Sequence, residues 1–239
     1  MLNGRRLPRR NLAAALSGLV LVACASGASV QQTNDQLPMY GQPGITRSEE
    51  LRKADDEFIK QTTAPVGTRE VASKVLHSQG NAYFNRGLVE LAMRRYNQAW
   101  LLNPNNYQPY WGFGRVMLQR GQFDEGIAYF EKATRLCDDD YQKVALLSDF
   151  GAAYGIKANK TNNPAERTRL YGLAYEQYKR STGMDPKYQR SWQNWASTLY
   201  QEGNYSETWK TIREGQVKAD AQFSPQFLRE LEQKMPEPK

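Results

Sequence analysis

The fold is decided by two stretches that repeat with a period of 34 positions. Residues 80–104 read GNAYFNRGLVELAMRRYNQAWLLNP, and residues 114–138 read GRVMLQRGQFDEGIAYFEKATRLCD. Gly80, Gly87 and Ala99 of the first stretch are again glycine, glycine and alanine in the second, and a phenylalanine takes the place of Tyr96. An echo of this length is typical of a helical hairpin that stacks on copies of itself, an architecture that forms binding surfaces more often than catalytic sites.

The same pattern continues, less regularly, into four units. Each unit has small residues at two positions, where a pair of antiparallel helices needs to approach closely. These positions are Gly80 and Ala92, Gly114 and Gly126, Gly151 and Ala174, and Ala196 and Thr208. Larger apolar residues supply the core between the helices, and on the second helices they are Tyr96, Phe130, Tyr178 and Ile212. The sequence therefore predicts an all-α stack of about four hairpins.

This pattern resembles the tetratricopeptide-repeat (TPR) family, whose consensus carries Trp, Leu-Gly, Tyr, then Ala, Phe, Ala and Pro over 34 residues. The resemblance implies a TPR solenoid with units at about 73–106, 107–140, 144–188 and 189–222. An extra helix is expected before the first unit, and Ser224-Pro225 predicts a capping helix over 224–235 that covers the open end of the stack. The whole repeat domain is thus expected over 46–235.

The third unit carries extra chain. Gly151 and Pro186 are 35 residues apart, whereas Gly80 and Pro104 are 24 residues apart. Since Asn163-Pro164 reads as the N-cap and first residue of a helix, the segment 157–163 is expected at the tip of a projecting hairpin. Such a tip is either a contact for a partner or, more often, a tolerated surface insertion.

The N-terminus has the features of a bacterial secretory signal peptide. Residues 1–10 carry four arginines and no acid, and the apolar run over 12–23 is too short to span a bilayer. The segment Leu21-Val22-Ala23-Cys24 resembles the lipobox, in which the cysteine is acylated, for example with palmitate, and becomes the N-terminus. Residues 1–23 are then removed, Cys24 is the lipid attachment site, and residues 24–45 are a flexible tether.

The resemblance to lipoproteins favours the periplasmic face of the outer membrane, because Ala25 stands where an aspartate tends to retain such proteins in the inner membrane. Cleavage without lipidation, giving a soluble periplasmic protein, is the alternative. The whole chain has 32 basic and 25 acidic residues, and loss of the four leader arginines leaves 28 against 25, or about +3. No basic cluster with interleaved aromatic residues remains, so nucleic acid is not an expected partner.

The sequence carries no recognisable catalytic or metal-binding motif. His77 is the single histidine, so the usual zinc and calcium ligand sets are missing, as are phosphate-binding loops and nucleophile elbows. With Cys24 acylated, Cys137 has no partner for an internal disulfide and is expected to be a small buried hydrophobe. We therefore expect no enzyme, no cofactor and no metal.

In the TPR family the first helix of each unit lines a concave groove. The resemblance implies a ligand groove formed by His77, Asn81, Phe84, Trp111, Arg115, Leu118 and Tyr200. The alternative for Trp111 is packing against the neighbouring helix, and His77 is expected in the groove wall or in the packing. The groove predicted in this way mixes aromatic, amide and cationic side chains, lacks acids and suits an extended or helical peptide. Only Asn81 matches the lysines and asparagines of the family's carboxylate clamp, so that subtype is not expected.

These features together predict a TPR lipoprotein adaptor that binds peptide segments of envelope proteins and is held to the membrane by its lipid. It looks like the lipoproteins of this fold that help pilus secretins assemble, insert outer-membrane proteins or recruit cell-wall machinery. One alternative is a peptidoglycan-binding or peptidoglycan-modifying protein with its site in the aromatic groove. Another is a structural scaffold that self-associates, for instance as a homodimer.

Overall fold

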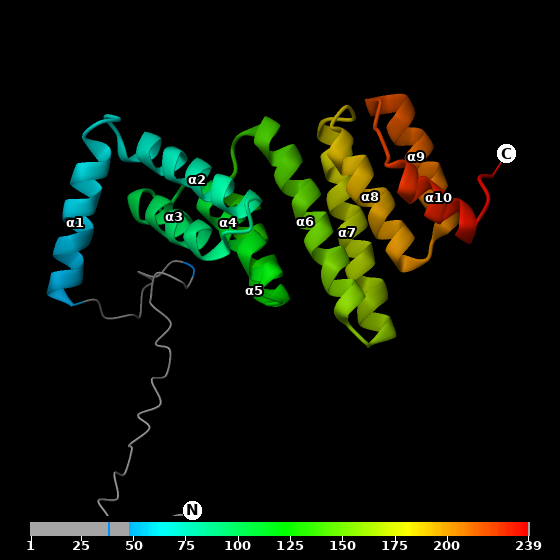
Figure 1. The fold of residues 1–239 in the computed structure, drawn as a ribbon, viewed down its shortest axis with the longest axis horizontal. Helices are drawn as coiled ribbons and strands as arrows, with labels where there is room; N and C mark the ends of the chain where they lie inside the picture. The colour runs from blue at the N-terminus through cyan, green and yellow to red at the C-terminus, as the bar shows by residue number, and fades with distance from the viewer. Residues whose placement is uncertain (1–37, 39–47, 239) are drawn as a thin grey trace, which may run out of the picture. The chain divides into compact units, whose positions relative to one another are not determined.

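The computed structural model describes Pro38 and residues 48–238, and within that part of the chain every regular element is a helix (Figure 1). The helices are α1 Glu49–Thr63, α2 Arg69–Asn85, α3 Val89–Leu102, α4 Tyr107–Gln119, α5 Phe123–Leu136, α6 Asp140–Lys160, α7 Pro164–Met184, α8 Gln189–Glu202, α9 Tyr205–Ala219 and α10 Pro225–Lys234. The predicted signal peptide, the lipid attachment site Cys24 and the tether lie outside the described residues.

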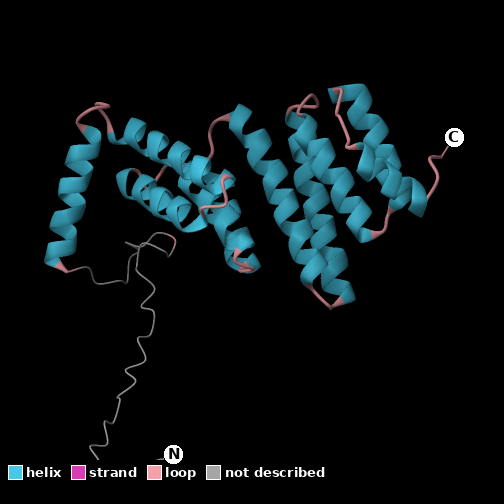
Figure 2. Cartoon of the chain, in the orientation of Figure 1, coloured by secondary structure: helices cyan, strands magenta, loops and turns pink. Residues whose placement is uncertain are grey.

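Consecutive helices pair into four hairpins, α2 with α3, α4 with α5, α6 with α7 and α8 with α9. Each hairpin also packs on the next, through α3 and α4, α5 and α6, and α7 and α8, and α6 contacts α8 as well (Figure 1). Figure 2 shows that short loops join the helices. The described residues therefore form the predicted stack of hairpins, with one additional helix at each end.

An aromatic ring on the second helix lies against a glycine of the first helix in each of the first three hairpins. A Cβ atom added to the glycine would overlap the ring of Tyr96 at Gly80, and would lie 2.8 Å from that of Phe130 at Gly114 and 2.7 Å from that of Tyr178 at Gly151. All three rings are buried. Glycine is needed at these positions because the ring fills the space that any side chain would occupy.

The fourth hairpin reverses this arrangement. Its glycine, Gly215, is on the second helix, and its aromatic residue, Trp192, is on the first. A Cβ atom added to Gly215 would lie 2.8 Å from the Cβ atom of Trp192, and the indole N–H of this buried tryptophan donates to the carbonyl oxygen of Pro186 at 2.9 Å. At the position of the aromatic ring the second helix carries Ile212, which belongs to the same buried cluster as Ala196, so the first helix has room for alanine where the other units have glycine.

Other repeated glycines are required by the backbone. Gly87 and Gly121 lie in the turns inside the first two hairpins, with φ angles of 75° and 78°. Gly203 has a φ angle of 91° in the corresponding turn of the fourth hairpin. Only glycine adopts this left-handed region without strain, so these residues mark the turn of each hairpin.

The N-terminal helix α1 packs on the first hairpin through its C-terminal half. Phe58 and Ile59 contact a buried cluster formed by Ala72, Leu76, Ala99 and Leu102. The helix begins after Ser48, whose hydroxyl accepts a hydrogen bond from the N–H of Leu51 at 3.2 Å. Leu51 itself is 46% exposed, so the apolar face of this helix is only partly covered.

The C-terminal helix α10 covers the far end of the stack. Ser224 is its N-cap and Pro225 its first residue, and the Ser224 hydroxyl accepts a hydrogen bond from the N–H of Phe227 at 3.2 Å. Leu231 is fully buried against Trp209 and Ile212 of the fourth hairpin. The helix thus shields apolar surface that the last repeat would otherwise expose.

No helix among the residues described is both long enough and apolar enough to cross a membrane.

Cys137 is buried at the end of α5, and burial raises the pKa of its thiol. A buried thiol of raised pKa is poorly reactive, in agreement with a packing role.

Candidate functional site

Two adjoining cavities lie where the first helices of the hairpins meet. Their volumes are about 320 and 210 Å³, and both are lined by Arg115, Asp149 and Arg190. We call this surface the central groove and define it by Asn81, Phe84, Asn85, Trp111, Arg115, Leu118, Asp149, Ile156 and Arg190. It therefore brings together five of the seven predicted groove residues, from helices α2 and α4, and adds residues of α6 and α8.

Arg115 occupies the middle of the central groove and is held from two sides. Its Nη1 donates to Oδ1 of Asn81 at 3.1 Å, and its Nη2 donates to Oδ1 of Asn85 at 3.2 Å. The guanidinium carbon lies 4.2 Å from the centre of the Phe84 ring. Because Arg115 is on α4 and these partners are on α2, the contacts fix a cation between two repeats.

His77 is a packing residue and does not face the groove, so of the two expected places for it, groove wall or packing, the structure shows the second. His77 is 6% exposed and lies behind Asn81, with its ring centre 5.6 Å from that of Tyr96. Oδ1 of Asn81 accepts from the Tyr96 hydroxyl at 2.8 Å and from Arg115, so the amide nitrogen of Asn81 faces Nε2 of His77 at 3.3 Å. Nε2 is then the acceptor and the imidazole is neutral.

The surroundings of His77 favour this neutral form strongly. Burial, and to a smaller extent the positive charge of Arg115, lower the pKa of His77 from 6.5 to about 3. The residue is thus a packing element that orients Asn81, and Asn81 in turn holds Arg115. The placement follows from the helix register, because His77 lies next to Leu76 on the buried face of α2.

Asp149 of α6 is a site residue that the sequence analysis missed. Its Oδ2 accepts a hydrogen bond from the indole N–H of Trp111 at 3.0 Å, and its Oδ1 lies 3.7 Å from Nη2 of Arg190. Burial raises the pKa of this carboxyl, while Arg190, Arg115 and the Trp111 hydrogen bond act in the opposite direction. The expectation of a groove without acids is therefore wrong.

A signal for Asp149 was present in the sequence. It is the only charged residue between Val144 and Ile156, in the otherwise largely apolar middle of α6. A lone acid at such a position needs a hydrogen-bonding partner, because an unpaired carboxylate is costly to bury. The partner could not be read from the sequence, since Trp111 is 38 positions away.

Tyr200 does not lie in the central groove, which is a second correction. Its ring centre is 5.6 Å from that of Tyr205 and 5.3 Å from that of Phe227. The residue packs on the buried cluster that contains Trp209, Ile212 and Leu231, because it lies in the last turn of α8 next to the capping helix α10. Truncating it would disturb the cap rather than a ligand contact.

The elongated third hairpin contacts both of its neighbours near the insertion 157–163. Nζ of Lys157 lies 2.5 Å from Oδ1 of Asp124 in the second hairpin. Nδ2 of Asn159 donates to Oε1 of Gln201 in the fourth hairpin at 2.5 Å. These contacts tie the C-terminal end of α6 to both neighbouring hairpins.

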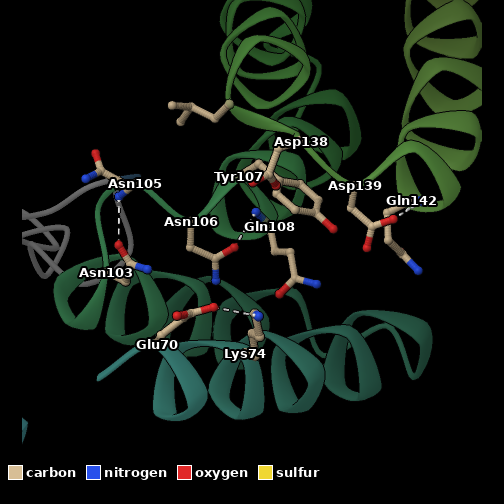
Figure 3. Close-up of a pocket in the computed structure, with 11 residues that line it drawn as sticks. Glu70, Lys74, Asn103, Asn105, Asn106, Tyr107, Gln108, Asp138, Asp139 and Gln142 are labelled. Atoms are coloured by element: carbon tan, nitrogen blue, oxygen red, sulfur yellow. Dashed lines mark hydrogen bonds and ion pairs between the residues drawn. The ribbon is translucent and has the colours of Figure 1, made fainter. Parts of the chain in front are cut away.

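A larger cavity, of about 440 Å³, lies at the edge of the same surface, near the beginnings of α2, α4 and α6 (Figure 3). Several of its polar side chains form hydrogen bonds and ion pairs within the protein. Lys74 and Glu70 form an ion pair at 2.8 Å, and the side chains of Asn106 and Asp139 cap α4 and α6. Within the described part of the chain, no group of three His, Cys, Asp or Glu residues could hold a metal ion.

Comparison with known proteins identifies the repeat. A family model of the tetratricopeptide repeat matches residues 107–140, which are α4, α5 and the turns around them. The chain therefore contains a tetratricopeptide repeat. A comparison with curated protein sequences found no match.

Solved structures agree with the TPR fold. A thermophilic TPR protein of Thermus thermophilus is 13% identical to this chain, with a TM-score of 0.59, over 68% of this chain and 82% of that chain. MamA is 15% identical over 73% of this chain and 96% of that chain, with a TM-score of 0.47. The likeness confirms an all-α TPR solenoid, a fold that supports the binding of protein partners.

Proposed function

We propose that this TPR protein is an adaptor that binds peptide segments of other proteins in its central groove. The observation that carries the proposal is the placement of Arg115 beside an apolar wall formed by Phe84, Leu118 and Ile156. Ile156 is exposed, and Phe84 and Leu118 are half-buried. A fixed cation next to accessible apolar side chains is a common anchor in protein interfaces, where arginine and aromatic residues dominate the binding energy.

The edges of the groove suit a polypeptide backbone. Asn85 and Gln119 are exposed, and each carries an amide that both donates and accepts hydrogen bonds. An extended peptide needs such partners on its main chain, while its side chains enter pockets. We therefore propose a binding role rather than a catalytic one.

We also propose that the partners are envelope proteins. The support is the sequence of residues 1–24, which has the features of a lipoprotein signal peptide ending at Cys24. In this proposal the lipid on Cys24 holds the protein at the periplasmic face of the outer membrane, and the groove recruits components of an envelope assembly. The proposed class of machinery includes pilus secretins, outer-membrane assembly and cell-wall synthesis.

Site-specific crosslinking tests the binding proposal. A photoreactive amino acid is placed at Ile156, which is 40% exposed in the groove, and in a separate variant at Val217, which is 86% exposed on α9. We expect envelope proteins to be captured in living cells from position 156 and not from position 217. Equal capture from both positions, or none from position 156, would contradict binding in the groove.

The lipid anchor is tested independently of the groove. Growth with a labelled palmitate analogue should label the native chain and leave a Cys24→Ser variant unlabelled. The native chain should also fractionate with outer membranes. Label on the Cys24→Ser variant, or none on either chain, would sink the lipoprotein proposal and leave the adaptor proposal standing.

A further inference from the structure

The central groove has an excess of positive charge. Among its defining residues the charged side chains are Arg115, Arg190 and Asp149, two cations against one acid, or a net charge of +1. The acid is already engaged, since its two oxygens face the Trp111 indole N–H and the Arg190 guanidinium. The charge of Arg115 also acts on Asp149, but Arg115 forms no ion pair among the described residues, so the groove keeps an excess of positive charge.

The contacts of Arg115 agree with this description. Its two hydrogen bonds go to the neutral amide oxygens of Asn81 and Asn85, and no carboxylate of the described residues lies within ion-pair distance of it. A guanidinium has five N–H donors, and two are used here. The remaining donors are held in a fixed orientation over the Phe84 ring, which reduces the entropy lost when a carboxylate binds.

An apolar wall adjoins this cation on one side. Leu118 and Ile156 line the same cavity as Arg115, and Ile156 is 40% exposed. Arg190, the second cation, lines this cavity as well, and its side chain is 60% exposed. A ligand lying along the groove would thus meet a cation and an apolar surface within one or two residues of each other.

We propose that the groove recognises an acidic segment of a protein partner, with a carboxylate bound by Arg115 and Arg190 and a neighbouring apolar side chain packed on Phe84, Leu118 and Ile156. The inference rests on the proposed peptide-binding function and names the chemistry of the peptide. Two arginines on different repeats, α4 and α8, bracket the carboxylate, so recognition depends on the stacking of the hairpins.

Model peptides test this recognition. Three decapeptides with blocked ends alternate leucine with aspartate, with asparagine or with lysine, and each is titrated into the purified, isotope-labelled full chain. The reporter is the indole N–H signal of Trp111, which contacts Asp149 in the groove. We expect the aspartate peptide to shift this signal and to bind about tenfold more tightly than the asparagine peptide, as is usual for a charge-assisted contact. The lysine peptide should leave the signal unchanged.

Three variants make the test specific. Arg115→Gln should reduce the affinity for the aspartate peptide about tenfold, to that of the asparagine peptide. Arg190→Gln removes a cation whose side chain is 60% exposed and should also weaken binding of the aspartate peptide. Arg213→Gln makes the same charge change on α9, away from the groove, and should have no effect.

The results separate the acidic preference of the groove from peptide binding itself. Equal binding of the aspartate and asparagine peptides, with shifts at Trp111, would overturn the acidic preference and leave the proposed groove function intact. Absence of shifts at Trp111 with every peptide would overturn both. A sulfated oligosaccharide of similar charge serves as the other class of anion, and a shift of Trp111 by the oligosaccharide alone would replace the peptide with a glycan.

Discussion

The burial of His77, the single histidine of the chain, can be tested through the pH dependence of the free energy of unfolding. His77 is buried and neutral, and its pKa falls from 6.5 to about 3 on folding. Below pH 6.5 His77 is therefore protonated in the unfolded chain, whereas in the folded protein it stays neutral until about pH 3. The free energy of unfolding must decrease as the pH falls through this window, because protons favour the state that binds them.

The magnitude follows from the two pKa values. The full difference corresponds to about 5 kcal/mol, and about 2 kcal/mol of it is lost between about pH 7.5 and about pH 5. The hydrogen-bond geometry gives the same sign, since a protonated Nε2 would point its N–H at the amide N–H of Asn81. The buried position of His77, and not its mere presence, is what makes the effect large.

Urea unfolding followed by circular dichroism measures the effect at both pH values. The matched control is His77→Gln, which keeps an acceptor for Asn81 and does not titrate. We expect the native chain to lose about 2 kcal/mol more than this variant when the pH is lowered. Other titrating groups, including Asp149 with its raised pKa, act in both chains and cancel in the difference. The same loss in both chains would refute the burial and the neutral state of His77.

Three further predictions concern packing, burial and capping. Gly80→Ala should lower the free energy of unfolding by about 1–3 kcal/mol, because its Cβ atom would overlap the Tyr96 ring. Gly172→Ala on α7, where the added Cβ atom would meet no other atom, should raise it by about 0.5–1 kcal/mol. Similar effects of the two variants on the thermal midpoint would contradict the steric argument. Asp149→Asn should raise the thermal midpoint at pH 7, because burial raises the pKa of the carboxyl and thus disfavours its charged form, while the amide oxygen still accepts from Trp111. The gain should shrink as the pH falls, because the carboxyl of the native chain then becomes protonated. Ser224→Ala should cost about 1 kcal/mol and speed hydrogen exchange in α10, so unchanged exchange there would rule out the cap.

Much of the fold was readable from local patterns. The 34-residue echo and the small residues at helix crossings predicted the hairpins, and the pairs Asn163-Pro164 and Ser224-Pro225 predicted where α7 and α10 begin. These signals are local because caps, turns and helix periodicity act within a few residues of the chain. The reversed packing of the fourth hairpin was not predicted, since it depends on which helix carries the larger ring.

By itself, the sequence determined that this chain is a stack of helical hairpins. Only the tertiary structure decided which side chains meet there. It joined Trp111 to Asp149 across 38 positions, set Arg115 on Phe84, buried His77 and turned Tyr200 toward the cap. The physical reason is that contacts between repeats depend on the rotation and spacing of one hairpin relative to the next, which arise from core packing and not from the pattern of any single helix.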